Sequence, residues 1–207
     1  MFRVMTSSAL LLMAAASIVS PLPAAAQQAA TRNPAEVQAG TYSVDTAHTQ
    51  IGFTLSHMGF SNFTGRLNGV TGSLTLTDGD RSASKISVSV PAKSFSTAVE
   101  KLDAELISAD WFDAKQFPAI TFTSTKVTPN GADSATITGD LTMHGVTKPV
   151  TLTAHLVGAG SNPLSKAYTV GFDAKGTVKR SDFGVTKYVP LIGDEVELDL
   201  HGAFEKK

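Results

Sequence analysis

Two polar side chains, His57 and Arg180, are candidates for chemistry because each lies near the end of an otherwise apolar strand face. Imidazole and guanidinium groups donate hydrogen bonds, and the guanidinium also carries a permanent positive charge. Such groups could hold the polar head of a ligand. They could equally serve the structure, with Arg180 paired to Asp182 or Asp110 and His57 bonded to a backbone carbonyl. The sequence leaves both interpretations open.

Several aromatic residues lie near the ends of the predicted strands and in the segment after the predicted helix. They form either an apolar mouth or an ordinary part of the core, and we favour the mouth. With His57 and Arg180, these predicted mouth residues are Phe60, Phe63, Trp111, Phe112 and Phe183.

Other chemistry finds little support in the sequence. His144, His155 and His201 fall on the polar parity of their strands, and no HxH or HExxH spacing exists, so we expect no metal site. No serine sits in a GxSxG motif. The chain has no cysteine, which excludes disulfides and thiolate chemistry. We expect no catalytic residue and no cofactor, and an enzyme remains the less favoured alternative.

The residues before His57 show the alternation of a strand with one apolar face. Similar alternation recurs along the chain and is clearest in residues 168–179 and 195–205. A parity change near Asn68-Gly69 predicts a β-bulge. Thr97 and Glu100 have the spacing of a capping box, which predicts one amphipathic helix. A short helical turn is expected to follow over residues 108–113.

About eight strands and one helix predict an all-β fold, either an antiparallel barrel or a sandwich. Outer-membrane barrels also alternate but carry aromatic girdles, whereas this chain has three tyrosines and one tryptophan. We therefore favour a soluble barrel with its apolar face inward. Small residues on that face either leave room for a ligand or act as bends that close the sheet. They are Gly72, Gly139, Ala154, Ala174, Gly176 and Gly202.

The 207 residues suit one folded domain. Residues 1–26 have a positive Arg3, an apolar run and small residues before the cleavage position, which predict a signal peptide. An uncleaved anchor is the alternative, but the run is short for a stable membrane span. Residues 27–40 contain few large apolar side chains and predict a flexible leader, and residues 41–207 form the barrel domain. The formal charge of −1 gives no support for nucleic acid binding.

Four segments, in this order, resemble the YceI-like family of secreted bacterial polyisoprenoid-binding proteins: VDTAHTQIGFTLSHMGFSNFTGRL, SADWFDAKQFPAITFTST, GDLTMHGVTKPVTL and KRSDFG. The likeness covers residues 40–204. It implies a lipocalin-like, extended eight-stranded antiparallel β-barrel with a helix across one end and a long tunnel for an isoprenoid chain. Many relatives carry an Arg-Asp-x-His-Leu pattern where this chain reads LDAEL at residues 102–106, so no role of that arginine or histidine is carried over.

The predicted mouth residues hold matching positions in these segments. Large apolar residues of the inward face are expected to line the tunnel. They are Phe53, Leu55, Leu74, Val88, Phe122, Leu141, Met143, Leu152, Val170, Phe172 and Leu198.

The function expected from this resemblance is to bind and sequester or carry a long-chain polyisoprenoid lipid in the periplasm. A prenyl quinone or a prenyl phosphate would suit such a tunnel. The expected partner is this hydrophobic small molecule, with no nucleic acid. Two alternatives stay open, a structural or stress-related scaffold with incidental lipid and an enzyme acting on an isoprenoid lipid. The oligomeric state, including a homodimer, also stays open.

Overall fold

The structure, a computed structural model, describes residues 30–207, so the predicted signal peptide lies outside the described residues. The strands are β1 (Gly40–Val44), β2 (Gln50–His57), β3 (Ser61–Leu67), β4 (Thr71–Leu76), β5 (Lys85–Pro91), β6 (Phe95–Ser96), β7 (Ala119–Pro129), β8 (Ser134–Met143), β9 (Val146–Ser161), β10 (Tyr168–Lys179) and β11 (Glu195–Lys206). The α-helix is α1 (Glu100–Leu106), and short 3-10 helices are η2 (Pro34–Glu36), η3 (Arg81–Ala83), η4 (Ala92–Ser94) and η5 (Arg180–Phe183).

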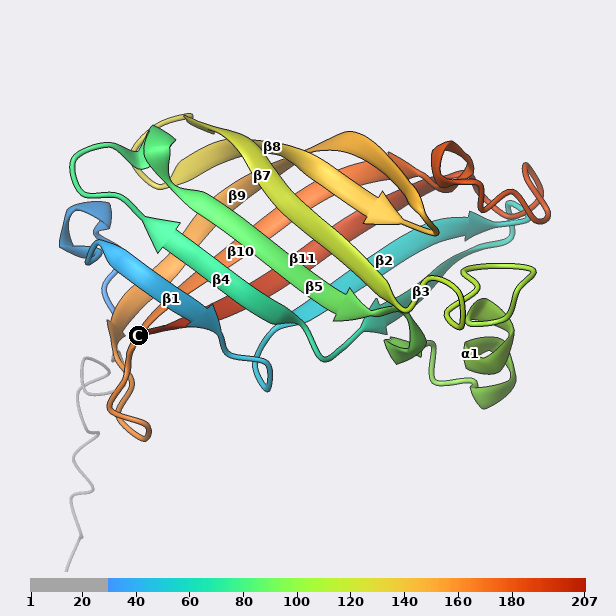
Figure 1. The fold of residues 1–207 in the computed structure, drawn as a ribbon, viewed down its shortest axis with the longest axis horizontal. Coiled ribbons are helices and arrows are strands. Elements are labelled where there is room, and N and C mark those ends of the chain that lie inside the picture. The colour runs from blue at the N-terminus through green and yellow to red at the C-terminus, as the bar shows by residue number, and fades with distance from the viewer. Residues whose placement is uncertain (1–29) are drawn as a thin grey trace, which may run out of the picture.

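The sheet closes on itself because β1 pairs with both β4 and β11. Around the ring the order is β1, β4, β5, β7, β8, β9, β10 and β11, and every pairing is antiparallel. The predicted eight-stranded antiparallel barrel is confirmed. Figure 1 shows an elongated barrel with α1 at one end and the start of the described chain at the other.

Three positions around the barrel are each occupied by two consecutive strands. β1 and β2 both pair with β11, at different places along its length. In the next position β4 pairs with β1 and β3 pairs with β2. In the third position β5 pairs with β4 and β6 pairs with β3. A short segment outside the sheet separates the two strands of each pair, and Gly69 (φ 73°) lies in the segment between β3 and β4. The β-bulge predicted near Asn68-Gly69 is therefore wrong, because the left-handed backbone at Gly69 interrupts the strand instead of bulging it.

The helix forms where predicted, but its cap differs. Val99 precedes the first turn, and the Asp103 carboxylate accepts from Thr97 N–H and Thr97 Oγ1–H, each at 2.7 Å. Asp103 thus takes the part expected of Glu100. The second predicted turn is present as a hydrogen-bonded turn, in which Trp111 N–H donates to Ser108 O at 3.1 Å.

The described part of the predicted flexible leader lies against the barrel instead. Thr31 and Ala159 exchange two backbone hydrogen bonds, of 2.8 and 2.9 Å. Tyr168 Oη–H donates to Glu36 O at 3.0 Å, and Val37 packs on a buried cluster that includes Tyr42. Burial and the neighbouring Tyr168 raise the pKa of Tyr42 to about 12. Backbone bonds, the hydrogen bond from the Tyr168 side chain and the apolar contact of Val37 hold this segment, which its composition did not indicate.

Candidate ligand-binding cavity

The barrel encloses a cavity of about 500 Å³. The cavity extends from Pro34 and Arg81 at the leader end to Trp111 and Arg180 at the α1 end. Its wall is dominated by apolar side chains from all eight strand positions. A volume of this size falls in the range of sites that bury a small molecule, about 300 to 1,000 Å³.

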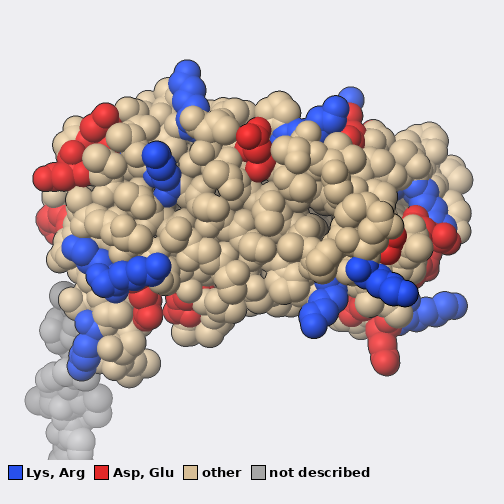
Figure 2. All heavy atoms as spheres, in the orientation of Figure 1, with Lys and Arg blue, Asp and Glu red and all other residues tan. Residues whose placement is uncertain are grey.

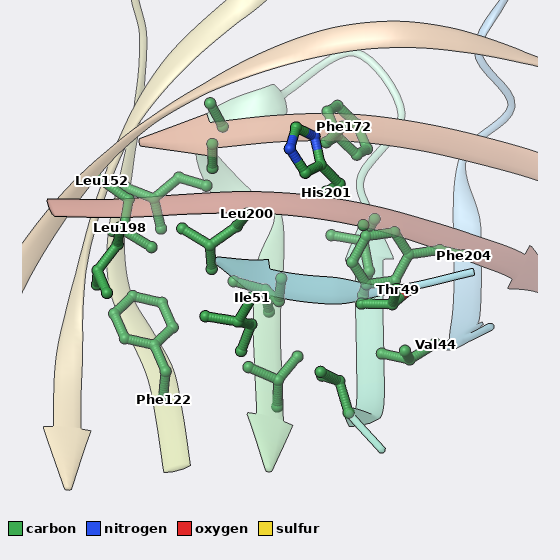
Figure 3. Close-up of a pocket in the computed structure, with 18 of the residues that line it drawn as sticks. Val44, Thr49, Ile51, Phe122, Leu152, Phe172, Leu198, Leu200, His201 and Phe204 are labelled. Carbon is green, nitrogen blue, oxygen red and sulfur yellow. The ribbon is translucent and has the colours of Figure 1, made fainter. Parts of the chain in front are cut away.

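The apolar faces of the strands point into this cavity. Figure 3 shows Ile51 of β2, Phe122 of β7, and Leu198 and Leu200 of β11 around one space. Leu198 and Leu200 are half-buried although their strand alternation directs them inward. Their remaining exposed surface faces the interior, so the protein's own side chains do not fill the barrel.

Ten of the eleven predicted tunnel residues line the cavity, and only Val170 does not. They are Phe53, Leu55, Leu74, Val88, Phe122, Leu141, Met143, Leu152, Phe172 and Leu198. Val170 is 0% exposed and packs with Tyr42 and Phe204 in a cluster at the leader end. Strand parity gives the direction of a side chain, but it does not tell whether a neighbour already occupies the space that the side chain faces.

The predicted mouth residues are divided. Trp111, Phe112 and Arg180 line the cavity at the α1 end, whereas the other four do not. His57 and Phe60 lie at the end of the β2–β3 hairpin, which pairs with the chain around Ile192. Phe60 is 88% exposed at the tip of that hairpin. The end of the hairpin therefore lies at the molecular surface, and its side chains do not line the cavity.

The remaining two aromatic residues belong to the core. Phe183 is 1% exposed within η5, and Phe63 is half-buried against the same apolar cluster. For these two positions the structure favours the ordinary core over the mouth.

Arg180 is 2% exposed and bonds the chain that follows η5. Its guanidinium donates from Nε to Gly193 O (2.9 Å), from Nη1 to Val185 O (2.9 Å) and from Nη2 to Ile192 O (2.7 Å). Its carbon Cζ also lies 5.4 Å from the centre of the Trp111 ring, a cation–π distance. Among the described residues no ion pair joins Arg180 to Asp182 or Asp110, so the predicted alternative of such a pairing is wrong. Asp110 is bonded by Lys187 instead, at 2.9 Å.

Asp194 lies close enough to Arg180 to balance part of its charge. Burial lowers the pKa of Arg180 and the charge of Asp194 opposes that shift. Burial of Asp194 raises its own pKa, but hydrogen bonds from Ser181 N (2.9 Å) and Ser181 Oγ (2.7 Å) outweigh it, and the net pKa is lowered. The α1 end of the cavity thus contains a charged but internally bonded arginine with a spare N–H on each terminal nitrogen.

The small residues of the inward face serve two purposes. Ala154, Ala174 and Gly202 line the cavity, whereas Gly72, Gly139 and Gly176 do not. A Cβ on Gly139 would lie 2.4 Å from Phe122 Cζ, and one on Gly65 would lie 2.4 Å from Phe53 Cζ. Glycine at these two positions therefore makes space for large rings of the wall. Room for a ligand fits Ala154, Ala174 and Gly202, whereas Gly139 accommodates a ring, which neither alternative anticipated.

His201 is among the residues that line the cavity (Figure 3), whereas the other histidines are not. His201 Nδ1 bonds Asp173 at 2.7 Å, and this partner raises the pKa of His201. His144 Nδ1 contacts Phe183 O at 3.0 Å. Within residues 30–207 no three His, Cys, Asp or Glu side chains are grouped as a metal site would require. No helix among these residues is both long and apolar enough to cross a bilayer.

Sequence reasoning missed part of the wall. Ile51, Val196 and Leu200 line the cavity and already lay on the apolar parity, so alternation could have found them. Pro34 and Ala35 also line the cavity, at its leader end. No signal in the sequence pointed to them, because small residues in a polar segment do not predict contact.

A closed barrel with a continuous apolar interior defines a lipocalin-like class of small-molecule-binding fold. Residues 42–204 match the model of the YceI-like domain. The chain belongs to the YceI-like family.

Related proteins agree with this assignment. A UPF0312 protein of Pseudomonas aeruginosa is 39% identical over 165 residues, covering 79% of this chain and 85% of that protein. A UPF0312 protein of Vibrio vulnificus is 37% identical over 172 residues, covering 81% and 88%.

Solved structures share the fold. The YCEI protein of Campylobacter jejuni has a TM-score of 0.63 at 29% identity, covering 79% of this chain and 96% of that one. BcnA of Burkholderia cenocepacia has a TM-score of 0.70 at 24% identity, covering 77% and 98%. A polyisoprenoid binding domain of Saccharophagus degradans has a TM-score of 0.62 at 16% identity, covering 80% and 98%.

Proposed function

We propose that this protein binds a polyisoprenoid lipid in its barrel and sequesters or carries it in the periplasm. The observation that carries the proposal is the apolar cavity running from η2 to Trp111. Membership of the YceI-like family and the fold shared with a polyisoprenoid binding domain support it. The predicted signal peptide supports export to the periplasm.

The energetics of such binding favour the tail of the ligand. Each isoprene unit has five carbons, and its burial contributes roughly 4 kcal/mol at about 0.8 kcal/mol per carbon. The entropic cost of association is on the order of 4 to 15 kcal/mol. Several buried units therefore offset that cost without a strong bond to the head group, which suits a carrier of prenyl quinones or prenyl phosphates.

Arg180 is the residue of the wall that we assign to the polar head. Its two spare N–H groups lie at the α1 end, where Trp111 and Phe112 provide flat apolar surfaces. A quinone oxygen or a phosphate oxygen accepts such a bond. This arrangement suits the binding of a polar head beside an apolar tail, and we therefore assign the protein a binding function.

Extraction of the purified protein tests the proposal. Organic extracts analysed by mass spectrometry are expected to contain a prenyl lipid in near-stoichiometric amount. Empty extracts, together with no uptake of added prenyl quinone, would contradict the proposal.

A variant that fills the cavity sharpens this test. Ala174 lines the cavity beside Ala154, its partner on the neighbouring strand β9, so Ala174→Phe places a ring in the empty space. The bound lipid is expected to fall several-fold while the fold is kept. His155→Phe is the matched control, because it adds a ring to the outer face of β9, where the side chain is exposed. Equal loss in both variants would show that the cavity is not the site.

A further inference from the structure

Exposed apolar side chains gather on two loops at the α1 end of the barrel. Phe60 is 88% exposed and Leu191 is 62% exposed. We call this surface the apolar tip, and it consists of Met58, Phe60, Tyr188, Val189 and Leu191.

Hydrogen bonding makes the tip one surface. Met58 N–H donates to Leu191 O at 2.8 Å, and His57 and Ile192 form an antiparallel bridge. Figure 1 shows the β2–β3 turn beside the chain that follows η5. Scattered exposed apolar residues are ordinary, but a contiguous patch marks an interaction site.

The two loops carry no formal charge. Residues 57–63 and 188–193 contain no Lys, Arg, Asp or Glu. The adjacent Lys187 is paired with Asp110 at 2.9 Å and with Glu105 at 3.6 Å. In Figure 2 this end of the molecule presents an uncharged surface between charged side chains. Binding at the tip must therefore rest on apolar contact and be insensitive to salt.

The shape of the tip selects among apolar partners. Met58 (φ 53°) and Gly59 (φ 71°) form a tight turn that projects Phe60 from the end of the hairpin. A projecting side chain needs either a matching groove or a deformable medium. The interfacial layer of a bilayer accepts projecting apolar side chains, and tyrosine is enriched at that depth.

The tip is continuous with the interior of the barrel. Trp111 lines the cavity, and its ring meets the Tyr188 ring edge to face, with the centroids 6.2 Å apart. One aromatic layer therefore separates the exposed tip from the apolar cavity. A carrier that takes a lipid from a bilayer needs its cavity close to the surface that it touches.

We propose that the apolar tip docks on the surface of a lipid bilayer and presents the α1 end of the cavity to it. Phe60 and Leu191 enter the interfacial layer, and the Trp111–Tyr188 contact covers the passage between bilayer and cavity. This inference rests on the proposed function as far as the passage is concerned. The docking itself depends only on the tip.

Vesicle binding by the full mature chain tests the docking. The probe is phosphatidylcholine vesicles, in flotation and with brominated acyl chains that quench tryptophan fluorescence. The chain has one tryptophan, so Trp111 reports contact at the tip. The double variant Phe60→Ser/Leu191→Ser is expected to reduce the bound fraction at least tenfold, and wild-type binding is expected to persist at about 0.5 M salt, where charge attraction is screened.

Leu164→Ser is the matched control. Leu164 is 91% exposed, but it lies in the turn between β9 and β10 at the leader end. Its removal is expected to leave vesicle binding unchanged. Because all three substituted residues are exposed, the urea midpoints of both variants should equal that of the wild type.

Three outcomes would overturn the docking: no binding of the wild type, equal loss in Leu164→Ser, or a tip that instead holds two copies together. The last would appear as a smaller oligomer on Phe60→Ser/Leu191→Ser with no vesicle binding by the wild type. Failure of the proposed function is distinguishable, because it would give empty lipid extracts while vesicle binding persisted.

Discussion

At the scale of single residues, Arg180 shows how a buried charge is accommodated in an apolar barrel. Its three backbone acceptors lie in the chain from Val185 to Gly193, so one side chain fixes the path of a long connection. Sequence parity placed Arg180 on the inward face. The acceptors could not be foreseen, because backbone carbonyls leave no mark in a sequence.

Substitution of Arg180 tests this structural contribution. Arg180→Met removes the donors of three buried or partly buried carbonyls, each worth about 1 kcal/mol or more when left unpaired. The free energy of unfolding in urea is expected to fall by about 3 kcal/mol. Lys179→Met is the control, since Lys179 is exposed next to it. A fall of equal size in both variants would contradict the assignment.

At the scale of elements, neighbouring strands depend on glycine where a large ring occupies the space that a Cβ would need. Gly139 on β8 is paired with Ser124 of β7, and a Cβ there would also lie 2.6 Å from Thr123 O. Alternation correctly predicted the faces of β7 and β8. It did not separate a glycine that opens space from one that accommodates a ring, because that depends on the partner strand.

Replacement of Gly139 is predicted to be costly for this reason. Gly139→Ala forces its methyl group against the Phe122 ring and the backbone, and overpacking of this kind costs about 1 to 3 kcal/mol. Gly171→Ala in β10 is the control, because its Cβ would meet its nearest neighbour at an ordinary 3.7 Å. Urea unfolding of both variants measures the difference, and equal midpoints would refute the packing argument.

At the scale of the whole molecule, the hydrophobic core of the barrel surrounds an apolar cavity. Half-buried leucines face a cavity of about 500 Å³, and their contacts are incomplete within the protein. A ligand in that space stabilises the folded state by mass action, because the unfolded chain has no such site. Stability and ligand content should therefore change together.

Delipidation tests this coupling. Removal of the lipid is expected to lower the thermal midpoint, and added prenyl quinone at about 100 times its Kd should restore about 2.7 kcal/mol. Differential scanning calorimetry measures both steps. Ala174→Phe, whose ring fills the cavity, should respond less to added quinone. A midpoint that is the same with and without lipid would contradict the hollow interior as the binding site.

The sequence by itself determined the strand faces, the antiparallel all-β fold and most of the cavity wall, because side-chain alternation is a local property of each strand. The tertiary structure decided which apolar residues meet empty space and which meet one another, as the contrast between Phe172 and Val170 shows. It also placed the leader on the barrel and left Phe60 at the surface. These outcomes depend on contacts between segments far apart in the chain, which no local pattern specifies.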